Sequence, residues 1–235
     1  MKKFNKLFII LLCCIGAMSV TSCLNSDDGG GLSDEEKHQY TLDIVGLYNG
    51  GGGEYANKIV FTNDTLPEDT KNPLKLDTIV GGVRGAMYNT VTAAGKDSAT
   101  FEINGVPGRL LAKELKDDKY KGLKKALEEA QSRPIRGTFY VQYLQYGTVL
   151  FNCITNDIKF SDLNYDGGTH DVTIKFCFPT IGSYEFVDLH KKVIIPLYID
   201  KIDIDEGKET IQIYDTTSPD INKHYAAMLQ IELNS

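Results

Sequence analysis

The chain has 235 residues, with 25 basic and 32 acidic side chains and a formal net charge of −7. Residues 1–22 hold three of the basic residues and no acidic one, so the remaining 213 residues carry 22 basic against 32 acidic side chains, a net charge near −10. That charge argues against nucleic acid as a partner. The length is sufficient for a domain with a core of its own.

The first 22 residues have the layout of a secretory signal. Lys2, Lys3 and Lys6 precede an apolar run over 7–18, which gives way to small residues before Cys23. The run is shorter than the roughly 20 residues that cross a bilayer, and no positive stop-transfer cluster follows it. The sequence therefore predicts a signal peptide over residues 1–22 and an exported body.

Small residues lead directly to the cysteine in Val20-Thr21-Ser22-Cys23, and Ser26-Asp27-Asp28 follows soon after. This arrangement resembles the lipobox and the acidic sorting segment of Bacteroidetes-type outer-membrane lipoproteins. The resemblance implies a lipid on Cys23, an outer-membrane location and exposure at the cell surface. Residues 23–33 would then form an acidic, glycine-rich tether. The alternative is an ordinary cleaved signal with an incidental cysteine.

A helix is expected at the start of the body. Ser33 and Glu36 have the spacing of a capping box, which predicts a helix over about 34–45 that ends at Gly46. The following Gly46-Leu47-Tyr48-Asn49-Gly50 resembles the first strand of calycin-like lipoprotein domains. The glycine run 50–53 lacks the Lys-Ser/Thr pair that a phosphate-binding loop requires.

The middle of the chain mixes short strands with one helix. We expect strands over 58–62 and 100–103, a bent strand pair or a loop over 76–91, and a turn at Asn104-Gly105. Apolar residues recur at helical spacing over 118–131 and predict a central helix that Pro134 ends.

From Ile135 onward the apolar period changes to two. The segments 139–146 and 148–154 read as a hairpin around Gly147, with further strands over 157–161, 171–178, 193–204, 209–214 and 226–233. The predicted fold is mainly β (α+β): an antiparallel β-sandwich or barrel with one N-terminal helix and one central helix. Residues 34–235 form a single domain in this interpretation, with a weak internal boundary near 133.

One local motif carries oxygen ligands. Asp162, Asn164 and Asp166, followed by Gly167, match the first half of a calcium-binding loop. The second half does not match, because Thr173 stands where a bidentate glutamate is needed. Asp-Gly and Asn are also the usual formers of a β-hairpin turn, and we favour the hairpin over calcium as the explanation.

Two cysteines, Cys153 and Cys177, remain in the body after the signal and Cys23 are set aside. An exported protein can join them in a disulfide, and two free thiols are an equal alternative. The four histidines are widely separated, and no sequence motif of a hydrolase is present.

Exposed aromatic side chains on a sheet can stack on sugar rings, but tyrosine also packs well in half-buried sheets, and tryptophan is absent. The strands carry six of the tyrosines: Tyr140, Tyr143, Tyr146, Tyr165, Tyr184 and Tyr198.

The first functional hypothesis is an envelope-anchored, non-enzymatic binding or accessory module that contacts a glycan, a peptide or another envelope protein. The alternative is a secreted hydrolase that acts on glycan through paired carboxylates. The sequence assigns no catalytic residue. Its candidate sites are Cys23 for lipid attachment and the calcium motif, and calcium is the only candidate cofactor.

Overall fold

The computed structural model describes residues 31–64, 77–91, 97–177, 179–214 and 226–235. Cys23 and most of the predicted tether lie outside these residues. The chain divides after Gly31, and Leu32–Ser235 makes one unit with a continuous hydrophobic core.

Helix α2 (Asp34–Ile44) opens this unit with the predicted capping box, because the Ser33 hydroxyl accepts from the Glu36 N–H and the Glu36 carboxylate accepts from the Ser33 N–H. Helix α4 (Lys121–Glu129) is the predicted central helix and buries Leu123 and Leu127. The other helical segments are short: η1 (Gly53–Tyr55), α3 (Gly108–Leu111), η2 (Ala112–Glu114) and η3 (Asp118–Tyr120).

The described residues contain thirteen strands, and every pairing between them is antiparallel. The main path through the sheet is β1-β4-β5-β6-β7-β10-β11-β13-β2-β3. The strands are β1 (Gly46–Tyr48), β2 (Lys58–Asp64), β3 (Asp77–Val80), β4 (Arg84–Val91), β5 (Asp97–Val106), β6 (Arg133–Gln145), β7 (Thr148–Thr155), β8 (Ile158–Tyr165), β9 (Gly168–Phe176), β10 (Thr180–Val187), β11 (His190–Ile204), β12 (Glu209–Gln212) and β13 (Ala226–Asn234).

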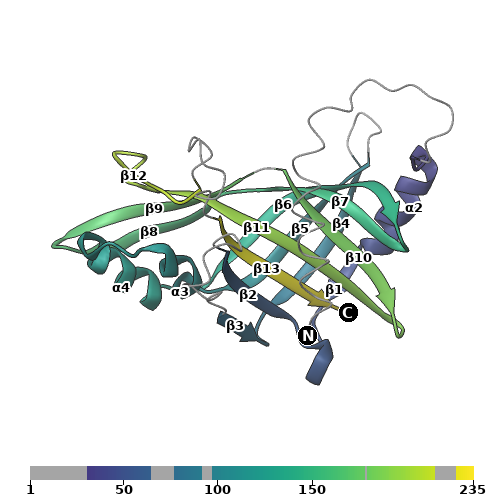
Figure 1. Ribbon diagram of the computed structural model, residues 1–235, viewed down its shortest axis with the longest axis horizontal. Helices are drawn as coiled ribbons and strands as arrows, with labels where there is room; N and C mark the ends of the chain where they lie inside the picture. Colours follow the sequence, from purple (N-terminus) through teal and green to yellow (C-terminus); the bar gives the residue numbers. More distant parts are fainter. Residues whose placement is uncertain (1–30, 65–76, 92–96, 178, 215–225) are drawn as a thin grey trace. The chain divides into compact units, whose positions relative to one another are not determined.

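Strand β11 belongs to two parts of the sheet. Its first half pairs with β10 and β13, whereas its second half, beyond an irregularity between Ile199 and Lys201, pairs with β9 and β12. The hairpins β6–β7 and β10–β11 therefore lie at one end of the unit, and the hairpin β8–β9 and the β11–β12 turn lie at the other (Figure 1).

The sheet curls into a half-barrel whose concave side is filled by side chains. Phe101, Phe139 and Phe151 are buried on this side. Across the interior, Gly85 of β4 lies so close to the Leu233 side chain of β13 that a Cβ would collide with it. Ile44 of α2 joins the same core. The interior is therefore packed by the chain itself.

Asn57 fastens the curled sheet where its two sides approach. Its buried amide donates to the carbonyls of Tyr48 (2.8 Å) and Val83 (3.0 Å), and its Oδ1 accepts from the Asn234 N–H (2.6 Å). One buried side chain thus bonds to the backbone of three segments that are far apart in the sequence.

The prediction of a mainly antiparallel β fold with an N-terminal and a central helix is confirmed. Three local expectations were wrong or incomplete. Asn104-Gly105 is not a turn but lies within β5, where Gly105 adopts φ +90° at an irregular pairing with β6. The sequence pattern also missed β10 and the short helix α3.

Candidate functional site

The candidate calcium motif lies in the β8–β9 hairpin. Asp166 and Gly167 form its two-residue turn with φ +49° and +80°. Asp162, with φ +58°, lies where the pairing shifts between Phe160 and Leu163. The structure therefore shows the hairpin that we favoured for this motif.

The oxygen atoms of the motif make separate contacts. Asn164 Oδ1 accepts from the Thr169 hydroxyl (2.9 Å), and the Asp166 carboxylate lies against Gly122 in the first turn of α4, where a negative charge is favourable. Among the described residues, no group of three or more His, Cys, Asp or Glu side chains is arranged to hold a metal ion. Calcium binding at Asp162, Asn164 and Asp166 stays a prediction.

A second polar contact ties this hairpin to the β11–β12 turn. His170 Nδ1 lies 2.9 Å from Asp205 Oδ2, and the Asp205 Oδ1 accepts from the Asp171 N–H (3.0 Å). The hydrogen bond with His170, followed by that from Asp171, holds the pKa of Asp205 below its ordinary value. The His170 ring also stacks on Tyr165, with centroids 4.3 Å apart. We call this region, from β8–β9 to the β11–β12 turn, the polar end.

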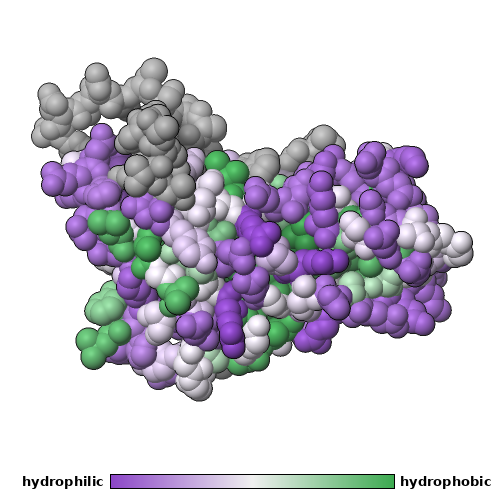
Figure 2. Space-filling model, turned by 180° about the vertical axis from the view of Figure 1, so that it is seen from behind, coloured by the Kyte–Doolittle hydropathy of each residue, from purple (hydrophilic) through white to green (hydrophobic). Residues whose placement is uncertain are grey.

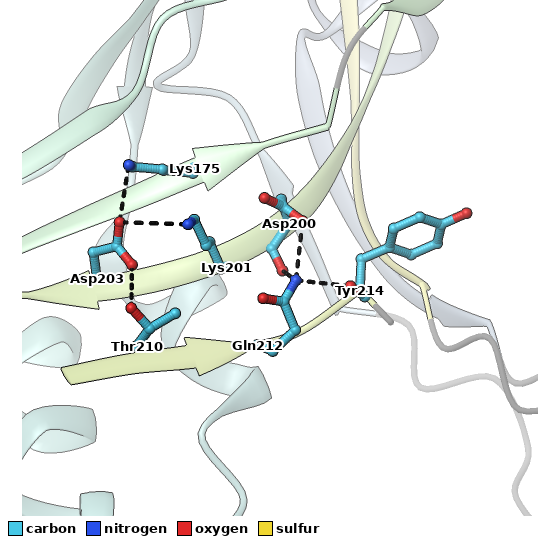
Figure 3. A network of polar contacts seen from close by, with 7 residues as sticks. All are labelled: Lys175, Asp200, Lys201, Asp203, Thr210, Gln212 and Tyr214. Atoms are coloured by element: carbon cyan, nitrogen blue, oxygen red, sulfur yellow. Dashed lines mark hydrogen bonds and ion pairs between the residues drawn. The ribbon is translucent and has the colours of Figure 1, made fainter. Parts of the chain in front are cut away.

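The outer face of β9, β11 and β12 carries a polar network (Figure 3). Asp203 accepts from the Lys175 ammonium (2.9 Å) and from the Thr210 hydroxyl (2.7 Å), with Lys201 at 4.0 Å. Burial by itself would raise the pKa of Asp203, but the hydrogen bonds from Lys175 and Thr210 outweigh it and the pKa is lowered. Asp203 is therefore a paired carboxylate whose charged form is stabilised by its neighbours.

Gln212 extends this network along β12. Its amide donates to the Asp200 carbonyl (3.2 Å), to Asp200 Oδ1 (3.1 Å) and to the Tyr214 carbonyl (2.8 Å), as Figure 3 shows. The contact fastens β12 to the middle of β11. The arrangement suits a structural role, because these polar groups bind one another.

The carboxyl groups whose pKa is shifted in the described part of the chain are all shifted downward. They are Glu36, Asp77, Glu102, Asp203 and Asp205. Each accepts a hydrogen bond that stabilises the charged form. A catalytic general acid at neutral pH needs a raised pKa instead.

Both cysteines of the body are free thiols. Cys153 is buried on β7, and burial raises the pKa of its thiol. Burial, with a smaller contribution from Asp200, raises the pKa of the Cys177 thiol to about 11. Thiols with raised pKa values are weak nucleophiles at neutral pH, so this environment favours packing over chemistry.

The outer face of β4, β5 and β6 carries two exposed tyrosines. Tyr88 pairs with Thr100, and Thr100 pairs with Thr138, so these three side chains form a row. Tyr140 lies two residues further along β6 on the same face. Tyr88 is 50% exposed and Tyr140 is 36% exposed. Strand spacing and rise place their Cα atoms about 12 Å apart. We call Tyr88, Thr100, Thr138 and Tyr140 the tyrosine face.

Apolar side chains gather at the opposite end from the polar network. Figure 2 shows them at its left edge, over the hairpins β6–β7 and β10–β11. The two hairpins are neighbours, because β7 pairs with β10 and the Thr148 hydroxyl donates to Glu185 (2.7 Å). We call the exposed apolar residues of these hairpins the hairpin-end surface: Leu144, Tyr146, Phe186, Val187 and Leu189.

The turn of the β10–β11 hairpin has an unfavourable residue. Asp188 and Leu189 occupy its two central positions, with φ +50° and +68°. A type I′ turn of this kind strongly prefers glycine at the second position, and a bulky residue there costs on the order of 1 kcal/mol. Leu189 is nevertheless 86% exposed, so burial does not offset this cost.

The tyrosines singled out from the sequence differ in position. Tyr184 is buried, Tyr165 is half-buried against His170, and Tyr140 and Tyr146 are exposed. Sequence reasoning missed Tyr88, because the glycines around it left 76–91 without a definite assignment. It also missed Leu189, because Asp188-Leu189 lacks the Gly or Asn that marks a hairpin turn.

These features define an antiparallel half-barrel protein with a packed interior and functional candidates on its outside. The chain belongs to the family described as a domain of unknown function (DUF4840), whose match covers residues 52–204. That segment runs from η1 to the end of β11 and leaves out β13, which lies between β11 and β2 in the sheet. Comparison with curated proteins and with solved structures gave no match.

Among the described residues, none of the helices combines the length and the apolar character needed to cross a membrane.

Proposed function

We propose that this chain is a non-enzymatic glycan-binding module of the cell envelope, attached to the outer membrane by a lipid on Cys23. The observation that carries the proposal is the tyrosine face. Tyr88 on β4 and Tyr140 on β6 are exposed on either side of β5 in the sheet. Thr100 and Thr138 lie in one row with Tyr88, and Tyr140 lies two residues beyond Thr138 on the same strand.

The tyrosine face combines the two contacts that sugars use. Aromatic rings offer apolar faces on which the C–H groups of a sugar ring can stack, while the phenolic hydroxyls remain available for hydrogen bonds. The separation of about 12 Å, estimated from strand geometry, suits two rings of one oligosaccharide chain. Because both tyrosines project from paired strands, little conformational freedom is lost when a ligand binds.

The packed interior supports binding on the outside of the sheet. Phe101 and Met87 fill the concave side directly behind the tyrosine face. The polar groups at the other end of the unit are engaged with one another, as the pairing of Asp203 with Lys175 illustrates. The tyrosine face presents exposed aromatic rings, whereas the concave side is filled and the polar groups of the polar end bind one another.

The glycan proposal is tested with the body that begins at Leu32, because the core lies within this unit. A glycan array identifies the ligand, and titration then compares the wild type with Tyr88→Ala and Tyr140→Ala. We expect each substitution to weaken binding by about tenfold, as the loss of one stacked ring predicts. Tyr146→Ala is the matched control, since Tyr146 is exposed but lies outside the tyrosine face. Absence of any bound glycan, or unchanged binding by the double variant, contradicts the proposal.

The anchor is tested separately with the full chain. Palmitate labelling in cells should mark the wild type, and Cys23→Ala should abolish the label. Continued incorporation in the variant would overturn lipid attachment at Cys23 and would leave the glycan proposal untouched.

A further inference from the structure

We propose that the hairpin-end surface inserts into a lipid bilayer. This inference goes beyond glycan binding, because it concerns different residues on different strands.

The shape of the surface favours a bilayer over a protein groove. Tyr146 is 99% exposed, Leu189 is 86% exposed and Phe186 is 60% exposed, and all three lie in or beside the turns of two neighbouring hairpins. Apolar side chains at the tips of projecting turns can enter the boundary between headgroups and acyl chains without any rearrangement of the sheet.

The backbone at these turns points to a function other than folding. Tyr146 has φ +50° and Leu189 has φ +68°. Bulky residues rarely adopt this conformation, and strained positions of this kind cluster at binding sites. Neither side chain gains burial in return, so contact with something outside the protein explains their presence.

Basic and acidic side chains both flank the apolar tip. His190, Lys191 and Lys192 follow Leu189 directly, in a chain whose net charge is negative. The Lys191 ammonium donates to the Val45 carbonyl (2.9 Å), and the His190 ring stacks on Tyr55 (4.2 Å). Asp188 and Glu185 are the nearby acids of the same hairpin. Glu185 is the cross-strand neighbour of Lys192, so the acids offset the lysines and the apolar tips carry the attachment.

The entry point of the chain fits the same orientation. Helix α2, at whose start the chain enters this unit, lies at the end that carries the two hairpins (Figure 1). The nine residues from Leu24 to Leu32 can span at most about 32 Å. A lipid on Cys23 would therefore hold the start of this unit within about that distance of the membrane, although insertion of the tips does not require that lipid.

The test measures flotation of the body beginning at Leu32 with vesicles of phosphatidylethanolamine and phosphatidylglycerol. We expect the wild type to float with the vesicles, and Leu189→Gly and Phe186→Ser each to weaken binding at least about tenfold. Leu189→Gly gives the turn its preferred residue, so a loss of binding in this variant does not reflect unfolding. Val80→Ser is the matched control, because Val80 is 63% exposed on the edge strand β3, away from both hairpins.

Three results would overturn the inference. The first is absence of wild-type flotation, and the second is unchanged flotation of both hairpin variants. The third is concentration-dependent dimerisation that Leu189→Gly abolishes while vesicles do not bind, which would assign the surface to a second copy of the chain. The Tyr88→Ala variant should float like the wild type, so failure of the glycan proposal and failure of this one are distinguishable.

Discussion

The hairpin end and the polar end solve the same structural problem with different residues. Both reverse the chain in tight turns with positive φ: Tyr146-Gly147 and Asp188-Leu189 at one end, Asp166-Gly167 at the other. In the β8–β9 turn of the polar end, Asp166 and Gly167 suit their backbone, although Asp205 and Glu206 of the β11–β12 turn also adopt positive φ (+49° and +59°). The neighbouring side chains pair with one another, as His170 does with Asp205. At the hairpin end, bulky apolar residues occupy strained positions and remain exposed.

This difference teaches where to look for function in the half-barrel. Local chemistry and fold agree at the β8–β9 turn of the polar end, which is the pattern of a region selected for stability. They disagree at the hairpin end, where Leu189 serves neither the turn nor the core. Such disagreement is expected at functional sites, and it directs attention to the hairpins β6–β7 and β10–β11.

The largest effect should come from Asn57, which holds the curled sheet together near the hairpin end. Asn57→Ala leaves the Tyr48 and Val83 carbonyls and the Asn234 N–H without their partner. We expect a loss of roughly 3 to 5 kcal/mol in the free energy of unfolding, measured by urea denaturation. Asn104→Ala is the control, because Asn104 is exposed and its side chain bonds to Glu102 of its own strand. Equal losses in the two variants would contradict the role of Asn57.

Asp203 tests the polar end through pH. Its pKa is lower in the folded chain than in the unfolded chain, so its contribution is present above the unfolded value and is lost as the pH falls through the folded value. Asp203→Asn should cost about 1 to 2 kcal/mol at pH 7 and flatten the decline in stability below about pH 4. Thermal melts from pH 2 to 7 measure this, with Glu206→Gln as the control. If the stability of Asp203→Asn falls with pH as steeply as that of the wild type, titration of Asp203 does not cause the loss of stability at low pH.

Exchanging the turn residues sharpens the comparison between the ends. Leu189→Gly should raise the free energy of unfolding by about 0.5 to 1 kcal/mol, because it relieves the positive-φ strain. Gly167→Leu, at the corresponding position of the polar end, should lower it by about 1 kcal/mol for the same reason. Destabilisation by Leu189→Gly in a thermal melt would show that the leucine contributes to packing.

Calcium should have the smallest effect. Asn164 already accepts a hydrogen bond from Thr169, and Asp166 lies against the start of α4. A ligand bound only by the folded state raises the melting midpoint. Because we expect calcium not to bind here, the midpoint in EDTA should lie within about 1 °C of that in calcium. A larger rise with calcium that Asp162→Asn removes would establish the metal site.

Local chemistry explains which features were predictable from the sequence. The capping box of Ser33 and Glu36 and the turns at Gly147 and Asp166-Gly167 each depend on adjacent residues, and the structure contains all of them. Asn57 could not be recognised, since its partners lie 9, 26 and 177 residues away. The tyrosine face was equally hidden, because it exists only through the register of β4, β5 and β6.

The contrast between the two ends is tested most directly by labelling each of them in turn. A polarity-sensitive fluorophore is attached to Val187→Cys or to Glu206→Cys in the body beginning at Leu32, with Cys177→Ser to remove the half-buried thiol. On addition of anionic vesicles, the emission at 187 should shift to shorter wavelength while that at 206 stays unchanged. An unchanged emission at 187, or an equal shift at both positions, would contradict insertion of the hairpin end.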